Sequence, residues 1–265
     1  MKNYSLIIII PVYNTNPKKT ELASLQQFSK VYNWKYDVRI ICPDDFSDKE
    51  VVDYITLLNA PENVYVQYKR YDSKYFKSAE SYSQLLKSNS FYNDYTGYDY
   101  MLILQTDVWT LSFDNIDDWI NKGFDYIGAP ILTNKQHWPS SPCCGNGGLS
   151  LRKVSSFIKY TSNKEIIDIL NKNDVYNKYE DVFFCEGISQ YMYIDMPTWQ
   201  ECAEFAWDMN PDMLWDYTGG ELPHIGIHAW PKNIPFWKDK INVSNEAIEE
   251  AVKDNLDFIN IYYKH

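Results

Sequence analysis

The stretch Tyr98-Asp-Tyr-Met-Leu-Ile-Leu-Gln-Thr-Asp-Val-Trp-Thr-Leu111 is a short apolar run that ends in one aspartate, with a tryptophan close behind it. Met101 to Leu104 is too short for an ordinary helix, and its unbroken apolarity is typical of a strand buried on both faces. This predicts Asp107 at the carboxyl end of a central strand, the edge where open α/β sheets bind ligands. A carboxylate there could meet a metal ion or a sugar hydroxyl, or it could cap the next turn or helix. This stretch alone favours neither role.

Apolar runs and amphipathic patterns alternate along the rest of the chain. Leu6 to Val12 is a mostly β-branched apolar run, which predicts a buried first strand and is too short to span a membrane. Between residues 18 and 32, apolar residues recur every three or four positions, which predicts an amphipathic helix. The same patterns predict strands over 37–45, 63–68, 124–130 and 149–152, a loop over 133–142, and helices over 51–58, 78–91, 154–160, 164–171 and 245–263. This alternation predicts an α/β fold with a mixed, mostly parallel central sheet flanked by helices.

The composition sets limits on structure and partners. The chain has 265 residues, enough for one large α/β domain, and we expect a single domain over 1–265. Its net charge of -11 argues against binding to a nucleic-acid backbone, which depends on clustered lysines and arginines. The 23 tyrosines, 9 tryptophans and 12 phenylalanines provide core mass and flat faces for ligands such as sugar rings. An odd number of cysteines without Cys-x-x-Cys spacing predicts reduced thiols in a cytoplasmic protein: Cys42, Cys143, Cys144, Cys185 and Cys202.

Three further short stretches and one histidine could form part of a functional site, and each also has a purely structural interpretation. Asp44–Asp45 could contact a base or ribose, or form a turn after a proline. Gly145–Gly148 holds three glycines in four residues, so the backbone there bends or approaches something closely, yet it contains neither phosphate-binding glycine motif. Glu180–Asp181 could form a site or could stabilise the dipole of the helix it opens. His228 could be a ligand or a hydrogen-bonded core residue.

Taken together, these stretches resemble the glycosyltransferase-A superfamily, in particular a group of short, mostly microbial glycosyltransferase-like proteins. The resemblance covers about residues 6 to 232 and rests on the order of its pieces. These are Pro-Val-Tyr-Asn, Leu-Gln-Thr-Asp-Val-Trp, Tyr-Ile-Gly-Ala-Pro, Gly-Asn-Gly-Gly-Leu-Ser-Leu-Arg, Glu-Asp-Val-Phe-Phe and Gly-Ile-His-Ala-Trp. It implies a Rossmann-like fold with a nucleotide-binding half over about 1–110, an acceptor-binding half over about 111–240, and a C-terminal helix and tail over 241–265.

The resemblance also implies a donor site. Asp107 occupies the last position of the superfamily's Asp-x-Asp metal motif, while Gln105 stands where the first aspartate would be. Asp107 and His228 together are then expected to hold one divalent cation, Mn²⁺ or Mg²⁺, on the donor diphosphate. The donor-binding residues implied in this way are Pro11, Val12, Tyr13, Asn14, Asp44, Asp45, Gln105, Thr106 and Asp107.

An acceptor site is implied by the second half of the chain. Asp181 corresponds to the general base of inverting members, and its place at a helix start is expected to keep it ionised near neutral pH. The acceptor-binding residues implied are Asn146, Gly147, Gly148, Glu180, Trp199 and Trp207. The chemistry agrees, because sugar transfer must stabilise a leaving diphosphate and remove a proton from the acceptor, tasks suited to a cation and a carboxylate.

The leading hypothesis is a glycosyltransferase that moves a sugar from a nucleotide diphosphate to a glycan hydroxyl, with inversion, in surface polysaccharide or glycoconjugate synthesis. The resemblance favours a UDP-sugar donor and a glycan or lipid-linked glycan acceptor. We expect a cytoplasmic protein with at most peripheral association at the inner face of a membrane. The alternative, motivated by Gln105, is a catalytically inactive glycan- or nucleotide-binding module. A hydrolase with two carboxylates ranks last, because nothing in the sequence pairs such carboxylates across a sugar.

Overall fold

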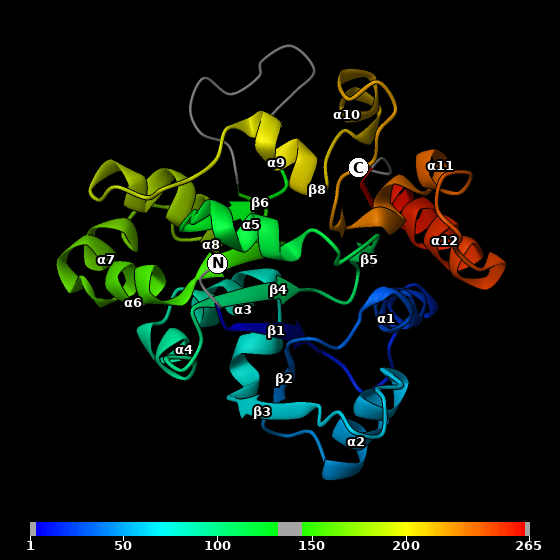
Figure 1. Ribbon diagram of the computed structural model, residues 1–265, viewed down its shortest axis with the longest axis horizontal. Helices are drawn as coiled ribbons and strands as arrows, with labels where there is room; N and C mark the ends of the chain where they lie inside the picture. The colour runs from blue at the N-terminus through cyan, green and yellow to red at the C-terminus, as the bar shows by residue number, and fades with distance from the viewer. Residues whose placement is uncertain (1–3, 132–144, 263–265) are drawn as a thin grey trace.

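The computed structural model describes residues 4–131 and 145–262, and its centre is a six-stranded sheet (Figure 1). The strand order is β3-β2-β1-β4-β7-β6. The four strands from β3 to β4 are parallel, and β7 runs antiparallel to both β4 and β6. The strands are β1 Leu6–Pro11, β2 Asp37–Pro43, β3 Gln67–Tyr71, β4 Tyr100–Leu104, β6 Tyr126–Gly128 and β7 Leu149–Lys153. The predicted fold class, a mixed and mostly parallel sheet flanked by helices, is confirmed.

The two central strands are apolar over their whole length because both faces of the sheet are covered. Every residue of β1 and of β4 is buried. The covering helices are α1 Lys19–Val31, α2 Asp48–Leu57, α3 Ala79–Leu86, α4 Asn89–Asn93, α5 Ile116–Lys122, α6 Val154–Ser162, α7 Lys164–Leu170 and α9 Trp199–Phe205. A short 3₁₀ helix, η1 Ser73–Phe76, leads into α3, while α8 Glu180–Val182 continues as a π-helical turn, η2 Phe183–Gly187, and a 3₁₀ turn, η3 Ile188–Gln190.

A second, three-stranded sheet stands beside the carboxyl end of β4. Its order is β5-β9-β8, with β5 Trp109–Thr110, β8 Ala206–Trp207 and β9 Gly226–Ile227. A second hydrophobic core forms there around four tryptophans, Trp109 of β5, Trp207 of β8, Trp230 and Trp237. Around this core lie α10 Pro211–Tyr217, η4 Trp230–Asn233, α11 Ile234–Trp237 and α12 Asn245–Tyr262. The small sheet matters for function because Asp107 precedes β5, Asp208 follows β8 and His228 follows β9.

Some predicted boundaries differ from the structure. The third strand begins at Gln67 rather than at residue 63, because a turn in which Val64 N–H donates to the Pro61 carbonyl occupies the preceding residues. The helix predicted over 78–91 is two helices, since the Ser88 hydroxyl accepts from Phe91 N–H and starts α4. The loop predicted over 133–142 lies outside the described residues. Within the described ranges, each helix is too short or too polar to cross a lipid bilayer.

Candidate active site

A cavity of about 980 Å³ opens at the carboxyl ends of β1 and β4. Tyr13, just after β1, and the segment 105–107, just after β4, line it together with the segment 146–148 that leads into β7. The starts of α1, α3 and α8, together with η4 and α12, form the rest of its walls. The cavity therefore lies at the sheet edge where parallel α/β folds bind ligands.

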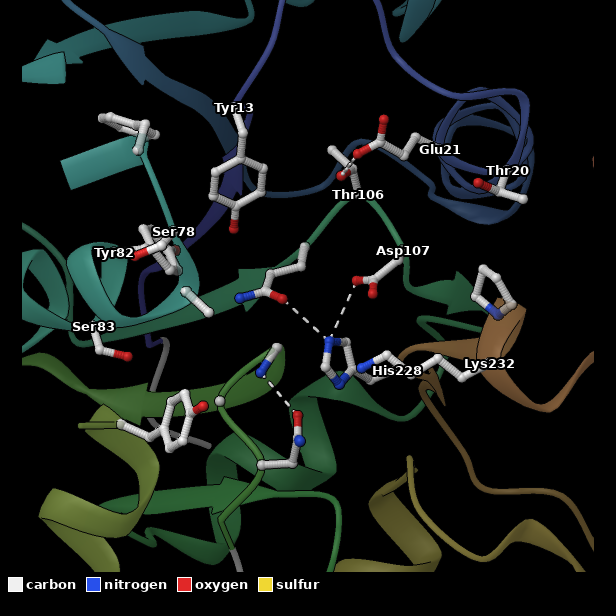
Figure 2. Close-up of a pocket in the computed structure, with 18 of the residues that line it drawn as sticks. Tyr13, Thr20, Glu21, Ser78, Tyr82, Ser83, Thr106, Asp107, His228 and Lys232 are labelled. Atoms are coloured by element: carbon white, nitrogen blue, oxygen red, sulfur yellow. Dashed lines mark hydrogen bonds and ion pairs between the residues drawn. The ribbon is translucent and has the colours of Figure 1, made fainter. Parts of the chain in front are cut away.

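Asp107 and His228 face one another at one end of this cavity (Figure 2). Nε2 of His228 lies 3.3 Å from Oδ1 of Asp107 and 3.1 Å from Oε1 of Gln105. Nδ1 of the same ring lies 3.5 Å from Oδ1 of Asp208. Burial lowers the pKa of His228, but the two aspartates outweigh it and raise this pKa to about 10. Burial likewise raises the pKa of Asp107, and the His228 ring outweighs it, so that pKa is lowered.

Gly148 and Asn146 allow the glycine-rich segment over residues 145–148 to pack closely against His228. A Cβ at Gly148 would lie 2.1 Å from Nε2 of His228, so only glycine allows the ring to approach. The Asn146 side chain donates from Nδ2 to Asp208 at 2.7 Å and accepts from the Gly148 N–H at 3.0 Å. The close approach expected from the glycines thus has a specific partner, His228.

One divalent cation could bind beside His228 by replacing a proton that the two aspartates favour on its ring. Histidine that binds a metal typically turns its second ring nitrogen to a carboxylate, which orients the ring, and Asp208 occupies that place behind Nδ1. Nε2 and the Asp107 carboxylate lie within 3.3 Å of each other on the cavity side. In the described part of the chain no group of three or more histidine, cysteine or acidic side chains could hold a metal. A cation here would therefore complete its coordination with ligand oxygens, as magnesium sites commonly do.

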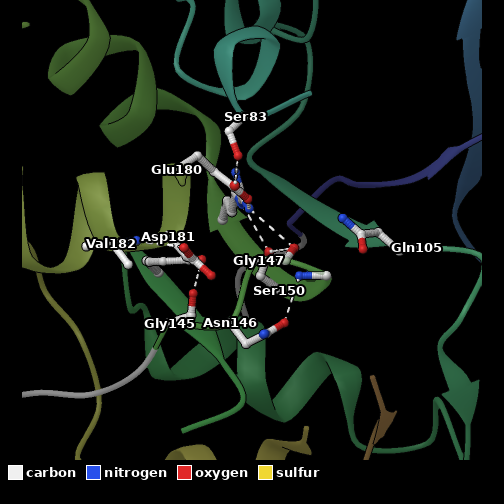
Figure 3. Close-up of polar contacts among 12 residues, drawn as sticks. Ser83, Gln105, Gly145, Asn146, Gly147, Ser150, Glu180, Asp181 and Val182 are labelled. Atoms are coloured by element: carbon white, nitrogen blue, oxygen red, sulfur yellow. Dashed lines mark hydrogen bonds and ion pairs between the residues drawn. The ribbon is translucent and has the colours of Figure 1, made fainter. Parts of the chain in front are cut away.

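Glu180 holds the other side of the glycine segment (Figure 3). It is buried, its Oε1 lies 3.0 Å from Nη2 of Arg152, and its Oε2 accepts from the Ser83 hydroxyl at 2.9 Å. Arg152 is fully buried and also donates to the hydroxyls of Tyr92 and Ser150. A Cβ at Gly147 would lie 2.1 Å from the Glu180 carboxylate. This ion pair therefore fixes the start of α8 against the glycine segment.

Asp181, the next residue, also lines the cavity. Burial and then the neighbouring Glu180 raise the pKa of Asp181 to about 7, against hydrogen bonds from the backbone N–H groups of Val182 and Gly147 that lower it. The expectation that a helix start keeps this carboxylate ionised is therefore wrong. The helical run that begins with α8 continues into η2, but desolvation by burial and the neighbouring Glu180 outweigh its dipole.

The donor-binding residues predicted from the sequence fall into three groups. Tyr13, Gln105, Thr106 and Asp107 line the main cavity. Asn14 and Asp45 line an adjoining pocket of about 470 Å³ that shares Tyr13 with it, and Asp44 accepts from the Ser73 N–H at 2.9 Å. Pro11 and Val12 are buried at the end of β1 and line neither pocket.

Among the predicted acceptor residues, Asn146, Gly147, Gly148 and Glu180 line the cavity, whereas Trp199 and Trp207 do not. Trp207 is fully buried in the second core, where its indole N–H donates to the Ala203 carbonyl at 2.7 Å. Trp199 packs against Tyr217, with ring centroids 4.6 Å apart. The structure thus corrects the prediction for these two rings, since Trp207 belongs to the core of the small β5-β9-β8 sheet and Trp199 packs against α10.

Four residues that the site uses were not predicted: Lys77, Arg152, Asp208 and Lys232. Asp208 and Arg152 act through contacts that are distant in sequence, which no local spacing reveals. Lys232 lies on the cavity wall four residues after His228, and Figure 2 shows it beside that ring. The sequence offers only a weak signal for Lys232, a lysine that follows a candidate metal ligand closely in a segment containing proline.

Residues 65–228, more than half of the chain, match the model of a family described as "Protein of unknown function (DUF5672)". The chain belongs to this family. The segment shared with the DUF5672 family contains Asp107, Asp181, Asp208 and His228, and leaves β1, α1 and α12 outside. No curated protein matches the sequence.

Solved structures show which fold this member of the DUF5672 family has. Mouse xyloside xylosyltransferase 1 in its apo form is similar with a TM-score of 0.54 at 11% identity, covering 85% of this chain and 97% of that one. The glycosyltransferase GlyE of Streptococcus pneumoniae TIGR4 is similar with a TM-score of 0.53 at 12% identity. That match covers 99% of this chain and 64% of GlyE. The chain has a glycosyltransferase-A fold, as its sequence motifs predict.

Proposed function

We propose that the protein transfers a sugar from a nucleotide diphosphate donor to a hydroxyl group of a glycan, with inversion at the anomeric carbon. One observation supports this most strongly. A single cavity at the ligand-binding edge of a glycosyltransferase-A fold contains Asp107, His228 and Lys232 at one end and Asp181, a carboxyl group with a raised pKa, across the glycine segment.

The first end suits a diphosphate. Lys232 lines the cavity at this end and Lys77 lines both the cavity and the smaller pocket, so both provide positive charge in a protein whose net charge is -11. Asp107 and Nε2 of His228 would hold a divalent cation, which when bound neutralises charge that develops on the leaving diphosphate. Tyr13 lies between this end and the smaller pocket of Asn14 and Asp45, which is suited to a nucleoside, with UDP as the favoured carrier.

The second end suits an acceptor hydroxyl. A base works best when its pKa lies near the working pH, and the pKa of Asp181 is raised to about 7. The hydrogen bond from the Gly147 N–H and the packing of Glu180 against Gly147 hold this carboxyl group on the cavity wall. Asp181 would take the proton of an acceptor, a glycan or lipid-linked glycan of surface polysaccharide or glycoconjugate synthesis, as it attacks the donor sugar.

One observation favours the second candidate, a binding module without catalysis. Gln105 stands where a metal-binding aspartate is expected, and its Oε1 lies 3.1 Å from the same Nε2 that a metal would need. A chain that keeps this contact when a ligand is bound would hold a nucleotide or glycan without activating the diphosphate.

Incubation with UDP-, GDP-, ADP- and dTDP-sugars, Mn²⁺ and a panel of oligosaccharides separates the two candidates. The proposed function predicts transfer, or slow donor hydrolysis without acceptor, and a product whose anomeric configuration by NMR is opposite to that of the donor. Binding without turnover supports the module. A product that retains the donor configuration contradicts the role given to Asp181.

A further inference from the structure

Three elements that are far apart in the sequence build one wall of the cavity. Thr20 comes from the start of α1, Lys232 from η4, and Asp254 and Asn255 from α12. Helix α12 packs against both α1 and η4, and Figure 1 shows it beside α1 at the edge of the molecule. Helices α1 and α12 lie outside residues 65–228, so this wall is built partly by residues outside the segment that matches the family model.

Helix α12 completes the start of α1. Lys18, which precedes α1, has no side-chain acceptor for the first backbone N–H groups of the helix, and such groups need a partner when buried. Glu250 of α12 supplies it, since its Oε2 accepts from the buried Thr20 N–H at 2.9 Å. Lys18 and Asp254 add an ion pair at 2.6 Å, which is exposed and therefore worth little by itself. Glu250 is the residue that fixes the start of α1.

The start of α1 in turn holds the residue before Asp107. Glu21, in the first turn of α1, accepts from the Thr106 hydroxyl through Oε1 at 2.8 Å. Its other oxygen accepts from the Lys18 N–H at 2.7 Å, so its carboxylate joins the helix start to the loop after β4. Thr106 is 3% exposed and has little freedom. A displacement of the α1 start would therefore reach Asp107 through this one partly buried hydrogen bond.

Helix α12 also holds the segment between His228 and Lys232. Nδ2 of Asn255 donates to the Pro231 carbonyl at 2.9 Å, directly before Lys232. Ala247 and Ala251 of α12 are buried in the same core as Trp230. Helix α12 therefore contacts the segment of Lys232 through Asn255. Through Glu250 it supports the start of α1, which contacts the residue before Asp107.

We propose that α12 is a positioning element for the diphosphate end of the cavity and that, resting on the proposed function, it sets the affinity for a nucleoside diphosphate. Glu250 positions Asp107 through Thr20, Glu21 and Thr106. Asn255 positions Lys232 through the Pro231 carbonyl. Neither residue needs to touch the reacting atoms, so both are positioning residues.

The chain offers a matched control for this test. Glu250→Ala and Asn255→Ala remove the two contacts, while Glu249→Ala removes an exposed carboxylate from the neighbouring position of the same helix. Hydrogen exchange of peptides covering 105–108 and 229–233 needs no ligand. We expect faster exchange over 105–108 in Glu250→Ala and over 229–233 in Asn255→Ala, with Glu249→Ala like the parent. Titration with UDP and GDP in the presence of Mn²⁺ should show about tenfold weaker binding in the first two variants only.

Each possible result of these measurements supports or overturns the positioning role of α12. Exchange and affinity that equal those of Glu249→Ala would overturn the positioning role. Faster exchange spread over the whole sheet, with a matching fall in melting temperature, would mean that α12 only stabilises the fold, and would overturn it too. If the parent protein binds no nucleoside diphosphate, the proposed function fails, with the effect on affinity that rests on it, whereas the exchange data still decide whether α12 positions the two segments.

Discussion

Gly147 and Gly148 are glycines because of what approaches them. Neither has the positive φ seen at Gly123, Gly219 and Gly220, so their backbone conformation is open to other residues. What excludes a side chain is contact, with Glu180 at the first and His228 at the second. The two glycines therefore let a carboxylate and an imidazole close on the backbone from opposite sides of the cavity.

Gly148→Ala tests this contact at the residue scale. The added Cβ would force His228 away from Asp107, so UDP binding that depends on Mn²⁺ should weaken by about 10- to 100-fold, as when the surroundings of a metal ligand are disturbed. Gly97→Ala is the control, because a Cβ there meets nothing within 4 Å. Equal affinity in both variants, or binding that chelation leaves unchanged, would contradict a metal site at His228.

Asp181 gives a pH dependence whose direction follows from its raised pKa. A base must be deprotonated to act, so kcat/KM should rise with pH up to about 7 and then level off with respect to this group. The profile is measured with the parent protein over pH 5 to 9 under saturating Mn²⁺. A rate that is flat between pH 5 and 7 would show that a group with an ordinary carboxyl pKa, or no base at all, limits the reaction.

At the scale of elements, Asp125 joins three segments at the edge of the main sheet. Its carboxylate accepts from the hydroxyls of Ser156 and Tyr160 in α6 and from the backbone N–H of Asp195. Burial raises the pKa of Asp125, but these hydrogen bonds outweigh it and lower that pKa. The charged form is thus the one that the fold favours.

Asp125→Asn should lower the free energy of unfolding at pH 7 by about 2–3 kcal/mol, because it replaces a charged acceptor of several hydrogen bonds. Since the folded pKa lies below the unfolded value of about 3.9, this contribution is complete above that pH and is lost as the pH falls through the folded pKa. Urea denaturation at pH 7 and pH 3.5 measures it. The difference in unfolding free energy between Asp125→Asn and the parent should be smaller at pH 3.5 than at pH 7. Asp118→Asn, at an exposed position, should show no difference from the parent.

Elements buried on both faces were predictable and edge elements were less so. The unbroken apolarity of β1 and β4 has one structural explanation, and both strands lie within a residue of their predicted bounds. β3 lies at the sheet edge, where Tyr68 is 40% exposed, so buried and exposed side chains alternate only weakly along it. The prediction therefore included residues that form the preceding turn. The π-helical turn after α8 was not predicted, because no local pattern in the sequence distinguishes it from an α-helical turn.

At the scale of the whole molecule, the candidate site joins residues whose relation the sequence shows only through the order of its motifs. Asp107, Asp181 and His228 were predicted in this way, and they line one cavity. Asp208 was missed because its partners, Asn146 and His228, lie 62 and 20 positions away and no periodicity links them. Arg152 was missed as a site residue because its burial depends on packing between β7 and α8. Local patterns predict strands, whereas the polar contacts that support the site arise from the tertiary fold.

Sugar transfer by the Asp181→Asn protein, measured beside calorimetric binding of the same nucleotide sugar, shows whether Asp181 is the base. Asparagine keeps the shape of the side chain but takes up no proton. We expect transfer to fall by about two to four orders of magnitude while the Kd of the donor changes less than threefold. Transfer at nearly the parent rate, or loss of donor binding together with transfer, would contradict the role of Asp181 as the base that acts across this cavity.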